Sequence, residues 1–181
     1  MLFRSHTDII AKALQSIATC PHPTVAAIEG VCIGGGLEIA CACDLRIASP
    51  VSRFGIPINR LGFPLAPDEL DGLLQLVGKA TALEILLEGR IFDAAEAKDK
   101  RLIHRIADDV AAEASIVAQR IARGGPLAAR INKQLVRRMS PAPEPLTEQE
   151  LRAAFSFLES DDYREGIRSF LEKRNPDFVG Q

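Results

Sequence analysis

The sequence predicts an α/β fold with short strands in the first third of the chain and helices in the rest. Two observations support this prediction. A short apolar run occurs at residues 24–28, an alternating segment that ends at Ser49-Pro50 occurs at 44–48, and a further short segment occurs at 53–56, as is typical of strands. From residue 67 onward, apolar residues recur at three- and four-residue spacing, as is typical of amphipathic helices. With 181 residues, of which 47% are hydrophobic, the chain can bury the core of a single domain.

Charge and hydropathy narrow the class of protein. The formal net charge is −2 and no long basic run is present, which argues against nucleic acid as the main partner. The longest uncharged stretch, residues 13–28, contains Pro21 and Pro23, so no transmembrane helix is expected. Arg4 interrupts the apolar start, and no signal peptide is readable. We therefore expect a cytoplasmic protein that binds no membrane.

The first elements expected are a helix and a strand. Residues 5–19 carry Ile10, Leu14 and Ile17 at helical spacing, which predicts an amphipathic helix. Prolines at 21 and 23 end this helix. The apolar run 24–28 that follows predicts a strand leading into a glycine-rich turn.

That turn, Gly34-Gly35-Gly36, opens a short apolar helix and is the first candidate site. Glycines allow positive φ and a close ligand approach, and the first N–H groups of a helix lack intrahelical partners. The turn therefore suits an anion or a developing oxyanion. The spacing excludes a dinucleotide fingerprint, because Ile39 stands where its third glycine belongs, and no lysine follows as in a phosphate loop.

Glu38 lies three residues after Gly35, on the first turn of the same expected helix. Main-chain donors beside a carboxylate suit thioester chemistry, in which an oxyanion is stabilised while a proton moves. The alternative is a capping role, because Glu at this position often reaches back to a main-chain N–H. From the residues alone both interpretations stay open.

The remaining elements follow from the same patterns. Further strands are expected at 44–48, 53–56 and 102–106. Further helices are expected at 67–77, 81–88, 93–100, 110–121, 126–139, 147–158 and 162–174, with a stiff proline-rich linker at 141–145. The proline-containing stretch 57–67 is expected to be an irregular loop across the mouth of a pocket. Its Ile58 and Leu61 either line an acyl tunnel or serve as ordinary packing.

The cysteines predict neither a metal site nor a disulfide. No Cys-x-x-Cys pair is present, and Cys41 and Cys43 lie two apart on the expected helix, so they point to different sides. We expect these two, with Cys20 and Cys32, to be small buried hydrophobes in a reducing compartment.

Several segments together resemble the core signature of the crotonase (enoyl-CoA hydratase/isomerase) superfamily. They are Pro23 to Gly30, Gly34-Gly35-Gly36-Leu37-Glu38, Ala42-Cys43-Asp44 and Phe54-Gly55-Ile56-Pro57, and the similarity continues to Phe170-Leu171-Glu172-Lys173-Arg174. The resemblance implies a crotonase-like spiral of ββα units over residues 1–106. It also implies a C-terminal helical region over 107–181 that assembles the chain as a homotrimer or a dimer of trimers.

The resemblance also implies roles for individual residues. The Gly35 N–H is expected to form one half of an oxyanion hole for an acyl-CoA thioester, with Glu38 as acid or base. The remaining expected substrate-binding residues are Ile33, Gly34, Pro57, Ile58, Leu61 and Lys173. Lys173 matches a basic position near the CoA phosphates of an adjoining subunit, or is an exposed helical lysine. CoA is part of the substrate, so no separate cofactor is expected.

The chain departs from the family pattern at one site position. Ile58 stands where the hydratases have a second Glu. The nearest substitutes for that carboxylate are Asp68 and Glu69, and their place in the first turn of a helix explains them without a catalytic role. The chain also resembles a member that lacks the usual N-terminal segment. Hydration in lipid β-oxidation is still the first expectation. Isomerisation, decarboxylation and C–C cleavage by one carboxylate, or a catalytically weak assembly subunit, are the alternatives.

Overall fold

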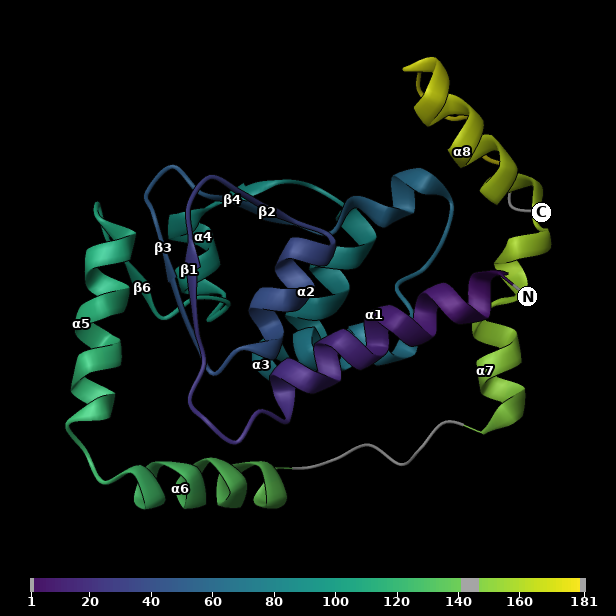
Figure 1. The fold of residues 1–181 in the computed structure, drawn as a ribbon. Coiled ribbons are helices and arrows are strands. Elements are labelled where there is room, and N and C mark those ends of the chain that lie inside the picture. Colours follow the sequence, from purple (N-terminus) through teal and green to yellow (C-terminus); the bar gives the residue numbers. More distant parts are fainter. Residues whose placement is uncertain (1, 141–146, 180–181) are drawn as a thin grey trace.

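The computed structural model describes residues 2–140 and 147–179, and Figure 1 shows strands gathered early in the chain and helices around them. The helices are α1 Leu2–Ala18, α2 Gly35–Ala42, α3 Pro67–Glu88, α4 Ala94–Asp99, α5 Val110–Ala122, α6 Pro126–Met139, α7 Glu148–Ala154 and α8 Asp161–Glu172. The strands are β1 Val25–Ile28, β2 Val31–Ile33, β3 Leu45–Ala48, β4 Arg53–Gly55, β5 Phe92–Asp93 and β6 Arg105–Ile106. Two 3₁₀ helices are η1 Pro57–Leu61 and η2 Ser156–Glu159.

The strands form two small sheets that the chain enters in turn. One sheet has the order β1-β3-β6 with parallel neighbours, and the other has the order β2-β4-β5. β1 and β2 are separated by a turn at Gly30, whose φ is +78°, and the chain then continues into α2. β3 and β4 repeat this path and pair in parallel with β1 and β2. The result is a spiral of strand–strand–helix units.

The main core surrounds α2. Leu37, Ala40 and Cys41 from this helix are buried with Phe54 and Ile56 from the second repeat. An isolated helix of eight residues is marginal in water, so tertiary packing must stabilise α2. Figure 1 shows α2 in the middle of the molecule, between the strands and helices α1 and α3.

A buried cation holds the end of α2. The Arg46 side chain is only 2% exposed, and its Nη1 donates to the carbonyls of Ala40, at 3.2 Å, and Cys43, while its Nε donates to the Leu102 carbonyl at 2.9 Å. These acceptors include carbonyls at the negative end of α2, where a cation is favoured. Burial lowers the pKa of Arg46. Arg46 therefore ties the end of α2 to the segment before β6.

A smaller cluster lies on the outer side of the first sheet. Val110 and Val117 of α5 pack on Ile47 of β3, with Val25 and Leu45 at the edge. The helical spacing of the two valines places them on one face, as the sequence predicts. Helix α5 therefore covers the parallel sheet.

Most predicted elements are confirmed, and the differences have local causes. The predictions missed β2 (31–33), because three residues between two glycines show no periodicity and become a strand only by pairing with β4. The stretch 57–67 is not wholly irregular, since η1 forms after Pro57. The strand expected at 102–106 is reduced to β6, and α7 ends at Ala154 instead of reaching residue 158. The linker predicted at 141–145 lies outside the described residues.

Glycines interrupt α3 and end it where the sequence predicts. Gly78 has φ +72° and ψ 172°, so the helix is kinked there, and Gly89 ends it in the left-handed conformation. Among the cysteines, Cys32 and Cys41 are buried, whereas Cys20 and Cys43 are only half-buried, and all four are free thiols. None of the helices in the described part of the chain has the length and apolar character needed to cross a membrane.

Candidate active site

The glycine turn between β2 and α2 depends on one unusual backbone conformation. Gly34 has φ +54° and ψ −125°, a region that residues with side chains rarely adopt. Its N–H donates to the Gly55 carbonyl at 2.9 Å, which ties the turn to the end of β4. Its carbonyl accepts hydrogen bonds from the N–H groups of Leu37 and Glu38. The turn is therefore held from both sides while the chain enters α2.

Two main-chain donors are left open by this arrangement. The N–H groups of Gly35 and Gly36, the first two residues of α2, have no acceptor among the residues that the structure describes. Both glycines are exposed, and a Cβ added to either would meet nothing within 4 Å. Open N–H groups at the positive end of a helix suit a developing oxyanion. The surroundings leave room for a ligand to reach them.

The Glu38 carboxylate is buried and unpaired. Glu38 is 9% exposed and makes no hydrogen bond or ion pair to any residue of the described chain. The capping interpretation is therefore wrong, because the side chain bonds to no main-chain N–H of α2. Burial, and secondly the negative charge of Glu69, raises the pKa of Glu38 from 4.5 to about 7. Such a group can both take and give a proton at neutral pH.

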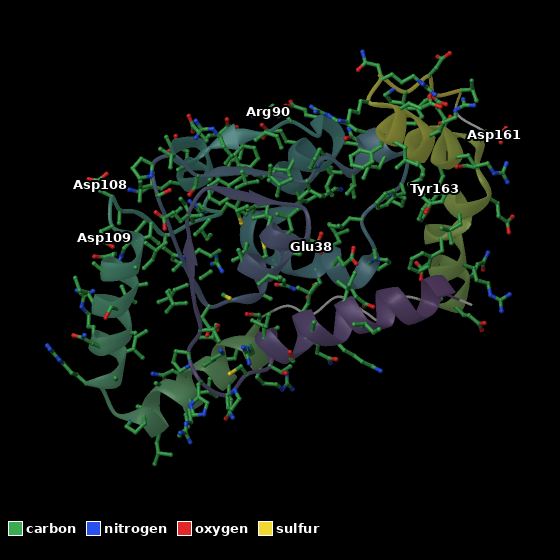
Figure 2. All side chains as sticks on the ribbon, turned by 45° about the horizontal axis from the view of Figure 1, so that its top comes forward. Glu38, Arg90, Asp108, Asp109, Asp161 and Tyr163 are labelled. Carbon is green, nitrogen blue, oxygen red and sulfur yellow. The ribbon has the colours of Figure 1, made fainter. Side chains whose placement is uncertain are left out.

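The open amides and the carboxylate lie close together by helix geometry. Gly35 and Glu38 are three residues apart in α2, so they share one face of the helix. Figure 2 shows Glu38 near the middle of the molecule. The site thus combines an oxyanion donor with an acid/base group on one short, packed helix.

The other predicted site residues occupy different places. Ile33 and Gly34 are half-buried and lead directly into Gly35. Pro57, Ile58 and Leu61 belong to η1, and Ile58 packs against the main core. Position 58 is therefore apolar and packed, and a role for these residues in substrate binding stays a prediction.

Lys173 lies at the end of α8. It is exposed and adopts the left-handed conformation, with φ +54°. Helix α8 contacts η1 closely, since a Cβ on Gly166 would lie 2.2 Å from the Leu61 carbonyl oxygen. Figure 1 shows α8 at the upper right edge, separate from α2. Contact of Lys173 with CoA phosphates stays a prediction that involves a second subunit.

The sequence prediction missed the proximity of Glu69. This residue lies in the first turn of α3, is half-buried, and accepts a hydrogen bond from the Ala66 N–H through Oε2 at 3.3 Å. Its helix packs on α2, where a Cβ on Gly72 would lie 3.4 Å from the Cβ of Cys41. The local signal explains Glu69 as a helix cap. Only the glycine inside the helix, at position 72, hints at a close helix contact.

Comparison with known proteins gives consistent matches. The family model for enoyl-CoA hydratase/isomerase matches residues 5–181. A probable enoyl-CoA hydratase of Mycobacterium leprae is 39% identical over 172 residues, which cover 93% of this chain and 66% of that protein. A mitochondrial Δ(3,5)-Δ(2,4)-dienoyl-CoA isomerase of Dictyostelium discoideum is 33% identical over 171 residues, which cover 92% of this chain and 58% of that protein. The chain therefore spans less than two thirds of the length of these relatives.

Solved structures share the fold. An enoyl-CoA hydratase/carnitine racemase from Magnetospirillum magneticum has a TM-score of 0.73 and 42% identity, over 98% of this chain and 67% of that one. A methylmalonyl-CoA decarboxylase has a TM-score of 0.87 and 25% identity, over 95% of this chain and 69% of that one. These structures confirm the predicted spiral of ββα units with a C-terminal helical region. The chain belongs to the enoyl-CoA hydratase/isomerase, or crotonase, superfamily.

Proposed function

We propose that this chain is an acyl-CoA thioester enzyme of the enoyl-CoA hydratase/isomerase type, which stabilises an enolate at the N-terminus of α2 and uses Glu38 as acid and base. One observation carries the proposal: open N–H groups at Gly35 and Gly36 lie one helical turn from a buried, unpaired carboxylate. Burying a carboxylate without a partner costs free energy, so a role in chemistry accounts for its presence.

The reaction begins at the thioester carbonyl. Its oxygen accepts a hydrogen bond from the Gly35 N–H. The negative charge that develops on the enolate oxygen is therefore stabilised by a donor that is already oriented. Removal of one such donor from other enzymes costs on the order of 3 kcal/mol of transition-state stabilisation. This interaction is therefore large enough to direct the chemistry toward the carbon next to the carbonyl.

Glu38 then moves the proton. In a hydration, the carboxylate takes a proton from water while the water oxygen adds to Cβ, and the same proton is delivered to Cα. The carboxylate ends the cycle as it began, and no oxidant or reductant is needed. A pKa of about 7 suits both steps, because each protonation state is populated at neutral pH.

The relatives support neighbouring reactions as alternatives. They include a dienoyl-CoA isomerase and a methylmalonyl-CoA decarboxylase. Because position 58 is apolar, a reaction that needs one carboxylate, such as isomerisation, decarboxylation or C–C cleavage, is consistent with this chain. A catalytically weak assembly subunit is the alternative from another class. Exposed apolar residues along α6, such as Ile131 and Leu135, favour it.

The proposal also includes the cofactor, the assembly and the compartment. The substrate carries coenzyme A, so no separate cofactor is proposed. The apolar face of α6 supports a homotrimer or a dimer of trimers, and Lys173 is proposed to meet CoA phosphates of an adjoining subunit. We propose the cytoplasm as the compartment and lipid β-oxidation as the setting.

Mass spectrometry of crotonyl-CoA incubated with the protein in D2O tests the proposal. The wild-type chain should add one water or introduce deuterium at Cα, and Glu38→Gln should do neither. Glu29→Gln is the matched control, because Glu29 is exposed and lies outside the site. Equal conversion by Glu38→Gln and the wild type would refute the role of Glu38. An unchanged thioester with every variant would remove crotonyl-CoA as a substrate and turn attention to methylmalonyl-CoA.

A further inference from the structure

We propose that Glu69 is a second acid/base carboxylate of this site, facing Glu38 across the contact between α2 and α3. It would supply the proton-transfer group that position 58 lacks in this chain. The inference rests on the proposed thioester chemistry, which it deepens by naming a further catalytic residue.

The contact between the two helices brings together the helix faces that carry the two carboxylates. Cys41 of α2 and Gly72 of α3 meet so closely that a Cβ on Gly72 would lie 3.4 Å from the Cys41 Cβ. Glu38 lies three residues before Cys41 in α2. Glu69 likewise lies three residues before Gly72 in α3. Residues three apart share a helix face, so both carboxylates lie on the faces that meet.

The electrostatics agree with this placement. The charge of Glu69 is the second cause, after burial, of the raised pKa of Glu38. A carboxylate at the far end of α3 would not have this effect. Neither Glu38 nor Glu69 forms an ion pair within the part of the chain that the structure describes. No cation therefore offsets the repulsion between them.

The local structure orients Glu69 but leaves it available. Its Oε2 accepts the Ala66 N–H, while Oε1 has no hydrogen-bond partner among the described residues. Pro67 begins α3 directly after Ala66, so the first turn is preformed. The side chain is half-buried, so part of it is exposed. Asp68, its neighbour on the same turn, is exposed and provides a natural comparison.

Two carboxylates so placed can divide the two proton transfers of a hydration between them. In a hydration, the ionised member takes a proton from water as the water oxygen bonds to Cβ. The protonated member gives its proton to Cα. After one turnover the pair holds the same number of protons, and transfer of the proton from the residue that took it to the residue that gave one restores the starting state. The reaction is balanced and needs no further reactant.

The test compares Glu69→Gln with Asp68→Asn in steady-state hydration of crotonyl-CoA. Gln keeps the shape of Glu and an oxygen that can accept the Ala66 N–H, so the cap and the fold should persist. We expect Glu69→Gln to lower kcat by on the order of 10²-fold with KM within about twofold, as for the loss of a general acid or base. Asp68→Asn should behave like the wild type.

A second variant separates catalysis from structure. Glu69→Asp keeps a carboxylate and should retain more activity than Glu69→Gln, whatever its effect on the unfolding midpoint. Equal kcat values for the Asp and Gln variants, or wild-type turnover by Glu69→Gln, would overturn the role of Glu69. If Glu38→Gln is then still inactive, the proposed function stands without this inference. An inert wild-type chain would overturn both.

Discussion

At the scale of single residues, the proposed chemistry depends on groups that the fold leaves without a hydrogen-bond partner. The Gly35 and Gly36 amides lack acceptors within the described chain, and Glu38 is buried without a partner. Another buried carboxylate, Glu165, is by contrast paired with Arg168 and Arg174. Unsatisfied polar groups cost stability, so their concentration at one helix N-terminus marks a functional site.

Because of this cost, we expect the contribution of Glu38 to the free energy of unfolding to depend on pH. The folded state raises its pKa from 4.5 to about 7 and so binds the proton more tightly than the unfolded chain does. Below pH 4.5 both states are protonated and no penalty exists. Stability is lost as pH rises from 4.5 to about 7, and the full penalty applies above. Because Gln cannot ionise, Glu38→Gln should exceed the wild type in unfolding free energy at pH 8 by up to about 3 kcal/mol.

Urea denaturation at pH 4.5 and pH 8 measures this difference. The gain from Glu38→Gln should appear at pH 8 and vanish at pH 4.5. Glu29→Gln is the control, since that side chain is exposed and should show no comparable gain. A gain of the same size at both pH values would show that packing, and not ionisation, sets the stability of the site.

At the scale of elements, α2 is a short helix that the rest of the chain holds in place. Its apolar residues fill the main core, Gly34 fixes its start, and Arg46 binds the carbonyls at its end. Positioning by core packing and by contacts at both ends suits a catalytic helix, because a shift of about 1 Å can cost 10²-fold in rate. The precision of the site is therefore a property of the surrounding elements.

Replacing Arg46 tests this role. Arg46→Met should lower the free energy of unfolding by about 3 kcal/mol, because the carbonyls of Ala40, Cys43 and Leu102 lose a buried donor. Urea denaturation at pH 7 is the measurement. Arg53→Met is the matched control. The Arg53 residue is exposed, its side chain donates among the described residues only to the nearby carbonyls of Val51 and Ser52, and its replacement should change stability by less than about 0.5 kcal/mol. Similar losses for both variants would contradict the argument.

At the scale of the whole molecule, helix α6 turns its charged face toward the rest of the chain and its apolar face outward. Lys133 and Arg137 turn toward the body, where they pair with Asp44, and Lys133 also donates to the His22 carbonyl at 2.7 Å. The apolar residues point outward at four-residue spacing. These exposed residues are Leu127, Ile131, Leu135 and Met139. Figure 1 shows α6 along the lower edge of the molecule. An apolar stripe turned away from its own chain favours contact with another subunit.

A double substitution tests this surface. Ile131→Glu with Leu135→Glu should convert an assembly into monomers while the helical content is retained, because charges on the stripe oppose burial against a partner. Sedimentation velocity measures the mass. Ile116→Glu on α5 is the control, since it places a charge on an exposed apolar residue away from the stripe. An unchanged mass in the double variant would exclude α6 from the interface.

The sequence alone determined the parts of this protein that depend on local chemistry. Periodicity and breakers located most helices, and the residues Gly34 to Glu38 defined the turn because only glycine tolerates its backbone and only a helix start leaves its N–H groups open. The family followed from motifs spread along the chain. The resemblance to the family, and no local pattern, identified Ile58 as the place where the hydratases have a second Glu.

Only the tertiary structure decided which distant groups meet. The strand state of β2 comes from pairing with β4, and the burial of Arg46 comes from acceptors on two separate segments, the end of α2 and the residues before β6. The effect of the Glu69 charge on Glu38 arises from packing of α3 on α2, which the periodicity along either helix cannot predict. A sequence pattern reports each residue's preference for its own backbone. Charge and burial between segments depend on distances through space, which only the folded chain sets.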